Sequence, residues 1–179
     1  VISKVPDTRL DDHPLIKIDP ETRVRHARGQ SLPDWLEMHS GNVDTFPDGV
    51  AFPESPEQVR ELLAHAKENN LIVIPYGGGT SVVGHINPET SDKPVLTIDM
   101  GKMNAMLGID TESQLATFGA GAPGPVVEEE LKKHNKTYLF KSYDNAGHSF
   151  FTTESPAYRQ DAARSGWKKI LQFYGEHLQ

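Results

Sequence analysis

Three consecutive glycines followed by two hydroxyl residues form the part of this sequence that is best suited to chemistry. Gly77–Gly79 precede Thr80 and Ser81 within IPYGGGTSVVGH, which spans residues 74–85. Glycines leave successive backbone N–H groups uncovered, so that these groups can form a concave nest for an anion, and the hydroxyls add donors. We therefore predict a diphosphate-binding loop. A wide structural turn between two strands is the alternative that spacing alone leaves open.

This glycine segment follows neither of two familiar nucleotide-binding patterns. No Gly-Lys-Ser or Gly-Lys-Thr follows the glycines, which excludes a Walker loop. The segment also lacks the G-x-G-x-x-G spacing that opens the helix of a dinucleotide-binding fold. The two patterns therefore do not identify the ligand.

The elements before and after the glycine segment predict an α/β sheet. A short strand at 50–52 is followed by a helix whose N-cap is Ser55 and which ends at 69–70. The apolar run 71–74 is typical of a strand that is covered on both faces, and 95–99 is a third strand. The order of strand, helix and strand predicts a βαβ unit. The glycine segment then lies at the carboxyl end of a strand, where open α/β sheets bind ligands.

The rest of the chain contains further periodic segments around this unit. Residues 1–25 are polar and proline-rich, and we interpret them as an arm packed on the body. Ser31 and Asp34 have the spacing of a capping box, which predicts a helix that Gly41 ends. The other expected elements are a short strand at 15–19, a hairpin at 107–110 and 114–118, a helix starting at Pro125, a strand at 136–144 and an amphipathic helix at 159–177.

Composition limits the partners that the chain is expected to have. The formal net charge of −7 argues against nucleic acid, because phosphate backbones are bound by clustered Lys and Arg. No apolar run has the length of a membrane span, so we expect no membrane partner. The eight histidines form no metal-binding pair of the H-x-x-x-H type, and no metal site is predicted. Absent cysteines and a start without signal-peptide features favour a cytoplasmic location.

Four segments, in this order, resemble one flavoprotein family. They are FPDGVAFPESPEQVRELLAHA, IPYGGGTSVVG, VLTIDMGKMNAMLGID and ATFGAGAPGPVVEEELKKHNKT. From about residue 19 to 137 the chain is similar to the PCMH-type FAD-binding domain of the vanillyl-alcohol oxidase and p-cresol methylhydroxylase flavoproteins, especially the alkylglycerone-phosphate synthase and D-2-hydroxyacid dehydrogenase branch. The resemblance implies an α/β (α+β) fold with a small βαβ-type sheet and flanking helices, like a truncated domain of that family.

The same resemblance implies FAD as the cofactor and a set of residues that bind it. Residues 75–81 would enclose the diphosphate, and the two residues Gly84 and His85 would continue along the flavin. Thr80 occupies the position at which some relatives carry a histidine bonded to FAD, so the resemblance implies noncovalent binding. The full implied set is Pro53, Pro75, Tyr76, Gly77, Gly78, Gly79, Thr80, Ser81, Gly84, His85, Gly121 and Gly124.

The last part of the chain, residues 138–179, resembles the C-terminal strand and helix of dienelactone hydrolases. In that family AGHSFF carries the catalytic histidine, which here is His148. No G-x-S-x-G or G-x-C-x-G nucleophile motif accompanies it, so a surface histidine is the favoured interpretation. The predicted organisation is an arm (1–25), an FAD-binding half-domain (26–137) and a hydrolase-like tail (138–179).

These observations give three functional hypotheses. The first is an FAD-binding module from a flavin-dependent oxidoreductase, whose parent reaction is hydride transfer from a 2-hydroxy acid or a related substrate to FAD. The second is a non-enzymatic chimeric protein that forms homo-oligomers through an exposed sheet edge or an apolar helix face. The third is an esterase or lactonase that uses His148. No catalytic base is assigned in the flavin-binding half.

Overall fold

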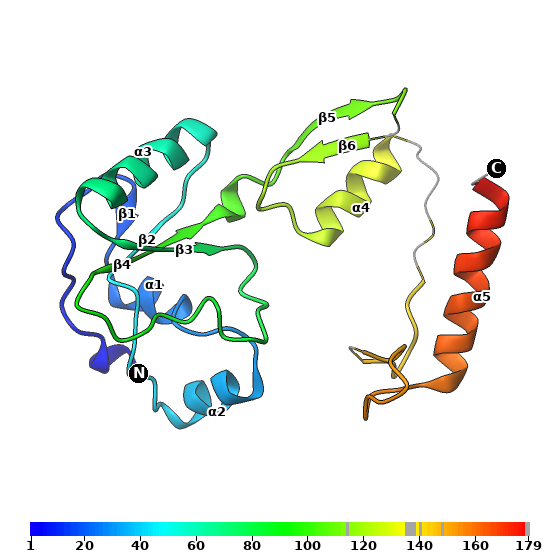
Figure 1. Cartoon of the computed structure of the whole chain (residues 1–179), viewed down its shortest axis with the longest axis horizontal. Coiled ribbons are helices and arrows are strands. Elements are labelled where there is room, and N and C mark those ends of the chain that lie inside the picture. The colour runs from blue at the N-terminus through cyan, green and yellow to red at the C-terminus, as the bar shows by residue number, and fades with distance from the viewer. Residues whose placement is uncertain (114, 135–138, 140, 148, 178–179) are drawn as a thin grey trace. The chain divides into compact units, whose positions relative to one another are not determined.

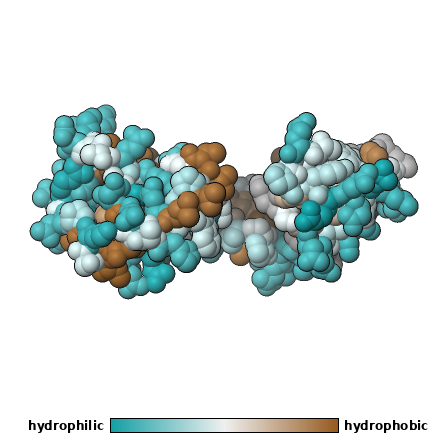
Figure 2. Space-filling view, turned by 90° about the horizontal axis from the view of Figure 1, so that it is seen from below, coloured by the Kyte–Doolittle hydropathy of each residue, from teal (hydrophilic) through white to brown (hydrophobic). Residues whose placement is uncertain are grey.

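The computed structural model describes residues 1–113, 115–134, 139, 141–147 and 149–177. The chain forms two compact units, Val1–Glu130 and Leu131–Gln179, and each is described by itself. The face seen in Figure 2 is mainly hydrophilic, with hydrophobic side chains gathered in separate patches. No helix in the described residues is both long and apolar enough to cross a membrane.

A four-stranded sheet forms the centre of the first unit (Figure 1). Its strands are β1 (Ile16–Lys17), β2 (Gly49–Ala51), β3 (Ile72–Tyr76) and β4 (Val95–Asp99), in the order β1-β2-β4-β3. The last three are parallel, and β1 pairs with β2 in the antiparallel direction. The predicted strands are therefore confirmed, but β4 lies between the two strands of the βαβ unit.

The strand β4 is more deeply buried than its neighbour β3. Residues Val95–Ile98 of β4 are buried, whereas in β3 only Ile74 is buried and Ile72 and Val73 are half-buried. The apolar run 71–74 still packs into two core clusters, Leu71 and Val73 into the one that contains Leu62, and Ile72 and Ile74 into the one that contains Ile86, but it is less deeply buried than β4. The physical reason is that β3 forms one edge of this sheet, while β4 has a strand on each side.

The helix α3 (Pro56–Glu68) covers one face of the sheet, and the helix α1 (Pro20–Arg25) lies on the opposite face (Figure 1). The Ser55 side chain accepts a hydrogen bond from the Gln58 N–H, which confirms the predicted N-cap. Leu62 of α3 is fully buried against Leu96 and Ile98 of β4. This packing fixes β4, and with it the pairing of β4 with β3.

The helix α1 (Pro20–Arg25) was not predicted, because six residues carry too little periodicity. The buried side chain of this helix is that of Arg23, where a short helix commonly buries an apolar side chain. The buried Arg23 donates from Nε to the Pro47 carbonyl over 2.6 Å and from Nη1 to the Pro6 carbonyl over 2.7 Å. Burial lowers the pKa of Arg23. The arm 1–25 thus contributes a strand and a helix to the first unit.

Three further elements, of which α4 ends just beyond the first unit, were predicted from local signals. The helix α2 (Leu32–Ser40) has the expected capping box and ends at Gly41, whose φ is 71°. The hairpin consists of β5 (Met106–Asp110) and β6 (Leu115–Phe118). The helix α4 (Gly124–Lys133) begins one residue before Pro125. The short 3-10 helices are η1 (Ile2–Lys4) and η2 (Met100–Lys102).

The second unit contains the helix α5 (Gln160–His177), as predicted. Phe151 packs on this helix at Gly166, where a Cβ would overlap the phenyl ring, and it meets the Trp167 ring edge-on at 5.8 Å. The Tyr143 hydroxyl donates to Ser165 Oγ over 3.0 Å. The predicted strand at 136–144 does not form at residues 139 and 141–144, which have no strand partner in the described chain, and the rest of that segment lies outside the described residues.

Candidate functional site

The glycine loop follows β3 directly and exposes a series of unused backbone donors. The N–H groups of Gly77, Gly78, Gly79, Thr80 and Ser81 form no hydrogen bond with any residue that the structure describes. Buried backbone N–H groups are nearly always paired, and Gly79 is the one buried residue of this row, whereas the other four residues are exposed or half-buried. These N–H groups are available to acceptor atoms of a ligand.

The three glycines differ in the reason for lacking a side chain. A Cβ on Gly77 would meet no atom within 4 Å, and a Cβ on Gly78 would make only an ordinary contact at 3.7 Å with Thr80. At Gly79 the φ is 67°, and a Cβ would overlap the Tyr76 hydroxyl. Gly79 therefore shapes the loop, whereas Gly77 and Gly78 leave open space that a close-fitting ligand requires.

A cleft of about 470 Å³ lies between this loop and the helices α1 and α2. Its volume is in the range of small-molecule sites. One wall is the backbone of the loop, and the other carries aromatic and polar side chains. The lining residues are Val24, Arg25, Arg28, Gly29, Gln30, Asp34, Trp35, Met38, His39, Tyr76, Gly78 and Gly79.

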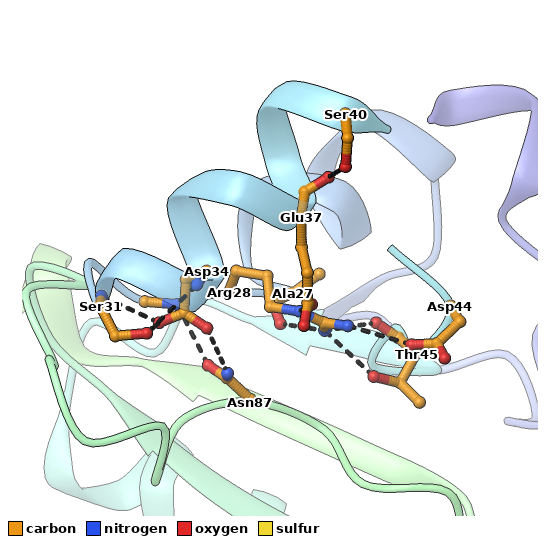
Figure 3. Close-up of polar contacts among 10 residues, drawn as sticks. Ala27, Arg28, Ser31, Asp34, Glu37, Ser40, Asp44, Thr45 and Asn87 are labelled. Carbon is orange, nitrogen blue, oxygen red and sulfur yellow. Dashed lines mark hydrogen bonds and ion pairs between the residues drawn. The ribbon is translucent and has the colours of Figure 1, made fainter. Parts of the chain in front are cut away.

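Hydrogen bonds hold the far end of the loop against the segment before α2. The Ser81 carbonyl accepts from the Gln30 N–H over 2.6 Å, and Gly29 packs so closely on that carbonyl that a Cβ would not fit. The Gly29 N–H donates to Asn87 Oδ1 over 3.1 Å. Asn87 Nδ2 donates in turn to Asp34 Oδ1 over 2.6 Å, as Figure 3 shows.

Asp34 is a buried carboxylate at the start of α2. Its Oδ2 accepts from the N–H and the hydroxyl of Ser31, over 3.0 Å and 2.6 Å (Figure 3). Burial opposes ionisation, but the hydrogen bonds from Ser31 and Asn87 outweigh it and hold the pKa of Asp34 below its usual range. Asp34 therefore supports the loop in its ionised form.

The arginines beside the cleft already have partners within the protein. Arg28 Nε donates to Glu37 Oε2 over 2.5 Å, Nη2 donates to Asp44 Oδ1 over 3.2 Å, and Nη1 donates to the Thr45 carbonyl over 3.0 Å (Figure 3). The exposed Arg25 pairs with Glu21 one helical turn earlier. The candidate anion donors are therefore the backbone N–H groups rather than these guanidinium groups.

Tyr76 closes the near end of the loop. Its ring lies 4.6 Å from the His26 ring, and its hydroxyl donates to the Arg25 carbonyl over 3.4 Å. Burial, with a smaller effect of Asp99, raises the pKa of Tyr76. The neutral phenol thus packs beneath Gly79 and supports the turn.

The structure brings most of the predicted site residues together around the loop. Pro75 and Tyr76 end β3, and the Thr80 hydroxyl has no partner among the described residues. Ser81 Oγ and His85 Nδ1 are 3.1 Å apart, so the Ser81 hydroxyl is engaged within the loop. Gly84 has a φ of 76° and makes the second sharp turn.

Four predicted residues lie elsewhere or have a different environment. Pro53 is fully buried, so its ring presents no surface to a ligand. A Cβ on Gly121 would overlap the Met100 carbonyl, so backbone packing already explains this glycine. Gly124 begins α4 with open space at its Cβ position. His148 lies outside the described residues.

Sequence reasoning did not find the residues of the opposite wall and of the loop support. Among these, Asp34 had been assigned only to a capping box, and Gly29, Gln30 and Asn87 carried no local motif. Their roles depend on contacts between residues more than 50 positions apart. Only the glycine spacing of the loop itself was a usable signal.

Comparison with known proteins gives one family model that matches the chain. It is described as "FAD binding domain" and matches residues 47–147, more than half of the chain. The match includes the sheet strands β2, β3 and β4 and the glycine loop, and it extends ten residues beyond the predicted boundary at 137.

Individual relatives agree with this match. The chain is 36% identical to an alkyldihydroxyacetonephosphate synthase from Trypanosoma brucei brucei, over 66% of this chain and 20% of the relative. It is 31% identical to D-lactate dehydrogenase (cytochrome) 1, mitochondrial, of Saccharomyces cerevisiae, over 56% of this chain and 17% of the relative. A solved alkyldihydroxyacetonephosphate synthase matches with a TM-score of 0.68 and 31% identity, covering 73% of this chain and 26% of that one. The chain thus spans about a fifth of the curated relatives.

Proposed function

The chain belongs to the FAD binding domain family, and from this premise we propose that its glycine loop binds the diphosphate of noncovalent FAD. The observation that carries this proposal is the row of five N–H groups, Gly77 to Ser81, that lie at the end of a parallel strand and have no partner among the described residues. FAD is the cofactor that the family supports.

The chemistry of the loop fits a diphosphate. Uncharged N–H groups and the Thr80 hydroxyl donate to phosphate oxygens, and no carboxylate of the described residues forms a hydrogen bond or ion pair with the loop. The open Cβ positions of Gly77 and Gly78 permit close approach of a ligand. Thr80 has no ring nitrogen that could bond covalently to a flavin, which favours noncovalent binding.

Apolar side chains continue from the diphosphate loop toward Gly84 and His85. Val82 is 59% exposed and Val83 is 77% exposed, although valine is normally buried. We assign these residues to the flavin side of the cofactor, because a flat aromatic ring system would cover them. Pro53 and Gly121 then act through packing, and Gly124, whose Cβ position is open, stays a proposed cofactor-binding residue.

FAD supplies the hydride acceptor when it is bound. Because the chain spans about a fifth of its relatives, the reaction is proposed for the whole protein rather than for these residues. The name D-lactate dehydrogenase designates an enzyme of a 2-hydroxy acid, which supports oxidation of that substrate class. The part of the chain described here contributes cofactor binding and orientation.

Titration with three ligands tests the proposal. FAD and ADP share a diphosphate, whereas riboflavin has the flavin ring without phosphate, so we expect FAD and ADP to bind and riboflavin to bind at least about tenfold more weakly. Isothermal titration calorimetry measures ADP, and flavin fluorescence measures the other two. Equal affinity for FAD and riboflavin, or no binding of FAD and ADP, would refute a diphosphate site.

A second candidate function is self-association without catalysis. Trp167, Leu171 and Tyr174 on α5 are each more than half exposed, which favours a partner for this helix. Light scattering measures the oligomeric state, and a Leu171→Glu variant should dissociate an assembly formed through α5. A monomeric wild-type protein would end this hypothesis. The hydrolase-like tail, the His148 esterase and the cytoplasmic location stay predictions.

A further inference from the structure

Asn87 occupies the point where the glycine loop rejoins the body of the first unit. Its backbone N–H donates to the Gly84 carbonyl over 2.9 Å, which closes the last turn of the loop. The neighbouring residues Ile86 and Pro88 are buried. Its side chain therefore extends from an anchored backbone position toward α2.

The side-chain amide of Asn87 uses both of its ends. Asn87 Oδ1 accepts from the Gly29 N–H, and Nδ2 donates to Asp34 Oδ1. The NH₂ group of this amide must face Asp34 and its oxygen must face Gly29, because an ionised carboxylate accepts hydrogen bonds and a backbone N–H donates them. Asp34 thus fixes the orientation of the amide, and the oriented amide holds Gly29.

The buried carboxylate of Asp34 is stabilised by uncharged hydrogen-bond donors, those of Ser31 and Asn87. It is 3% exposed and forms no ion pair among the described residues, since the nearby Arg28 is bonded to Glu37 and Asp44. A buried carboxylate is costly unless hydrogen bonds satisfy it. Ser31 and Asn87 supply those bonds, so removing the Asn87 donor leaves an acceptor of Asp34 unpaired.

The network ends at the ligand-binding loop itself. Gly29 precedes Gln30, whose N–H holds the Ser81 carbonyl over 2.6 Å. In a trans peptide the carbonyl and the following N–H point in opposite directions. The bond from Gln30 therefore fixes the orientation of the peptide between Ser81 and Val82, at the end of the row of unpaired donors.

We propose that Asp34 and Asn87 are positioning residues that hold the glycine loop and the α2 wall of the cleft in the arrangement that receives a diphosphate. This inference rests on the proposed function, because it concerns the same loop. Neither residue is assigned a contact with the cofactor. A merely structural role in capping α2 belongs to the Ser31–Asp34 bonds, which do not involve Asn87.

A residue exchange separates positioning from capping. Asn87→Asp removes the donor and places two carboxylates face to face, so we expect FAD and ADP affinity to fall about tenfold. The double variant Asp34→Asn with Asn87→Asp exchanges the amide and the carboxylate. It restores every bond, because the amide at position 34 then donates to the carboxylate at position 87, which still accepts from the Gly29 N–H. Its affinity should return to within about threefold of wild type. Asn104→Asp, at an exposed residue with no side-chain hydrogen bond in the described chain, controls for added charge.

Hydrogen exchange of the ligand-free proteins provides a readout that does not depend on FAD. The Gly29 and Gln30 amides should lose about tenfold protection in Asn87→Asp and regain it in the double variant, while the amides of α3 stay unchanged. Wild-type affinity in Asn87→Asp, or no recovery in the double variant, would overturn the positioning role. If the wild type binds neither FAD nor ADP, the proposed function fails, and unchanged Gly29 and Gln30 protection would then also overturn this inference.

Discussion

Two glycine-rich segments of the first unit look alike in sequence and differ in structure. In the loop 77–79, two glycines have open space at the Cβ position and no N–H group has a partner among the described residues. In the segment 119–124, Gly119 and Gly121 pack directly on the backbone of residues 100–103. Their N–H groups donate to the carbonyls of Ala105 and Met103.

A glycine-rich segment can arise for two physical reasons, close packing of the backbone or open space for a ligand. The segment 119–124 reads GAGAPG, which fits G-x-G-x-x-G and leads into α4, yet internal packing explains two of its three glycines, Gly119 and Gly121. It follows the antiparallel hairpin strand β6, not a parallel strand of a βαβ unit, so the context of the dinucleotide motif is missing. The loop without that motif has the free donors. Ligand binding is therefore better judged from unpaired N–H groups than from glycine spacing.

Gly121→Ala should have the largest effect and should act on stability. The added Cβ would overlap a backbone carbonyl, that of Met100, which cannot rotate away as a side chain can. We expect the free energy of unfolding to fall by about 3 kcal/mol. Chemical denaturation followed by circular dichroism measures this loss. A decrease below about 1 kcal/mol would contradict the packing explanation.

Local signals in the sequence predicted much of the fold but not the support of the site. Ser55 and the capping pair of Ser31 and Asp34 marked helix starts, because capping involves residues three positions apart. Strand order was not predictable, since nothing local places β4 beside β2. The bond between Asp34 and Asn87 spans 53 positions and therefore left no periodic or spacing signal.

Gly79→Ala should affect both stability and binding. Its φ of 67° is strained for alanine, and the methyl group would displace the Tyr76 ring. We expect a loss of about 2 kcal/mol of stability, together with weaker FAD binding. Denaturation and FAD titration of the same preparation measure the two effects. Gly79→Asn is the matched control, because asparagine tolerates a positive φ better than alanine, and it should lose less stability than Gly79→Ala. An equal loss in both variants would contradict backbone strain as a cause.

Gly77→Ala should affect binding alone. The Cβ would meet no protein atom within 4 Å, so we expect the free energy of unfolding to change by less than about 0.5 kcal/mol. FAD affinity should fall about tenfold, because the methyl group occupies the space needed for close approach of the diphosphate. Gly108→Ala, a second glycine with an open Cβ position, is the control and should bind FAD like the wild type. Unchanged affinity in Gly77→Ala would remove the distinction between the two segments.

Lowering the pH should weaken the hydrogen bonds of Asp34 that support the glycine loop before it affects the segment 119–124. The folded pKa of Asp34 is lowered, so its stabilising contribution is complete above the unfolded value of about 3.9 and is lost as pH falls through the folded pKa. The bonds of Gly119 and Gly121 involve only backbone groups, which do not titrate.

Hydrogen-exchange protection factors measured from pH 5 down to pH 3 separate the two responses. Gly29 and Gln30 should lose protection at a higher pH than Gly119 and Gly121, with a free-energy difference of about 1 kcal/mol or less. Asp34→Asn removes the titrating group and should abolish the separation. Asp48, whose pKa is also lowered, stays intact in that variant, so acid effects that arise from Asp48 are the same in both proteins. Parallel loss of protection in both segments of the wild type would show that Asp34 ionisation does not support the loop.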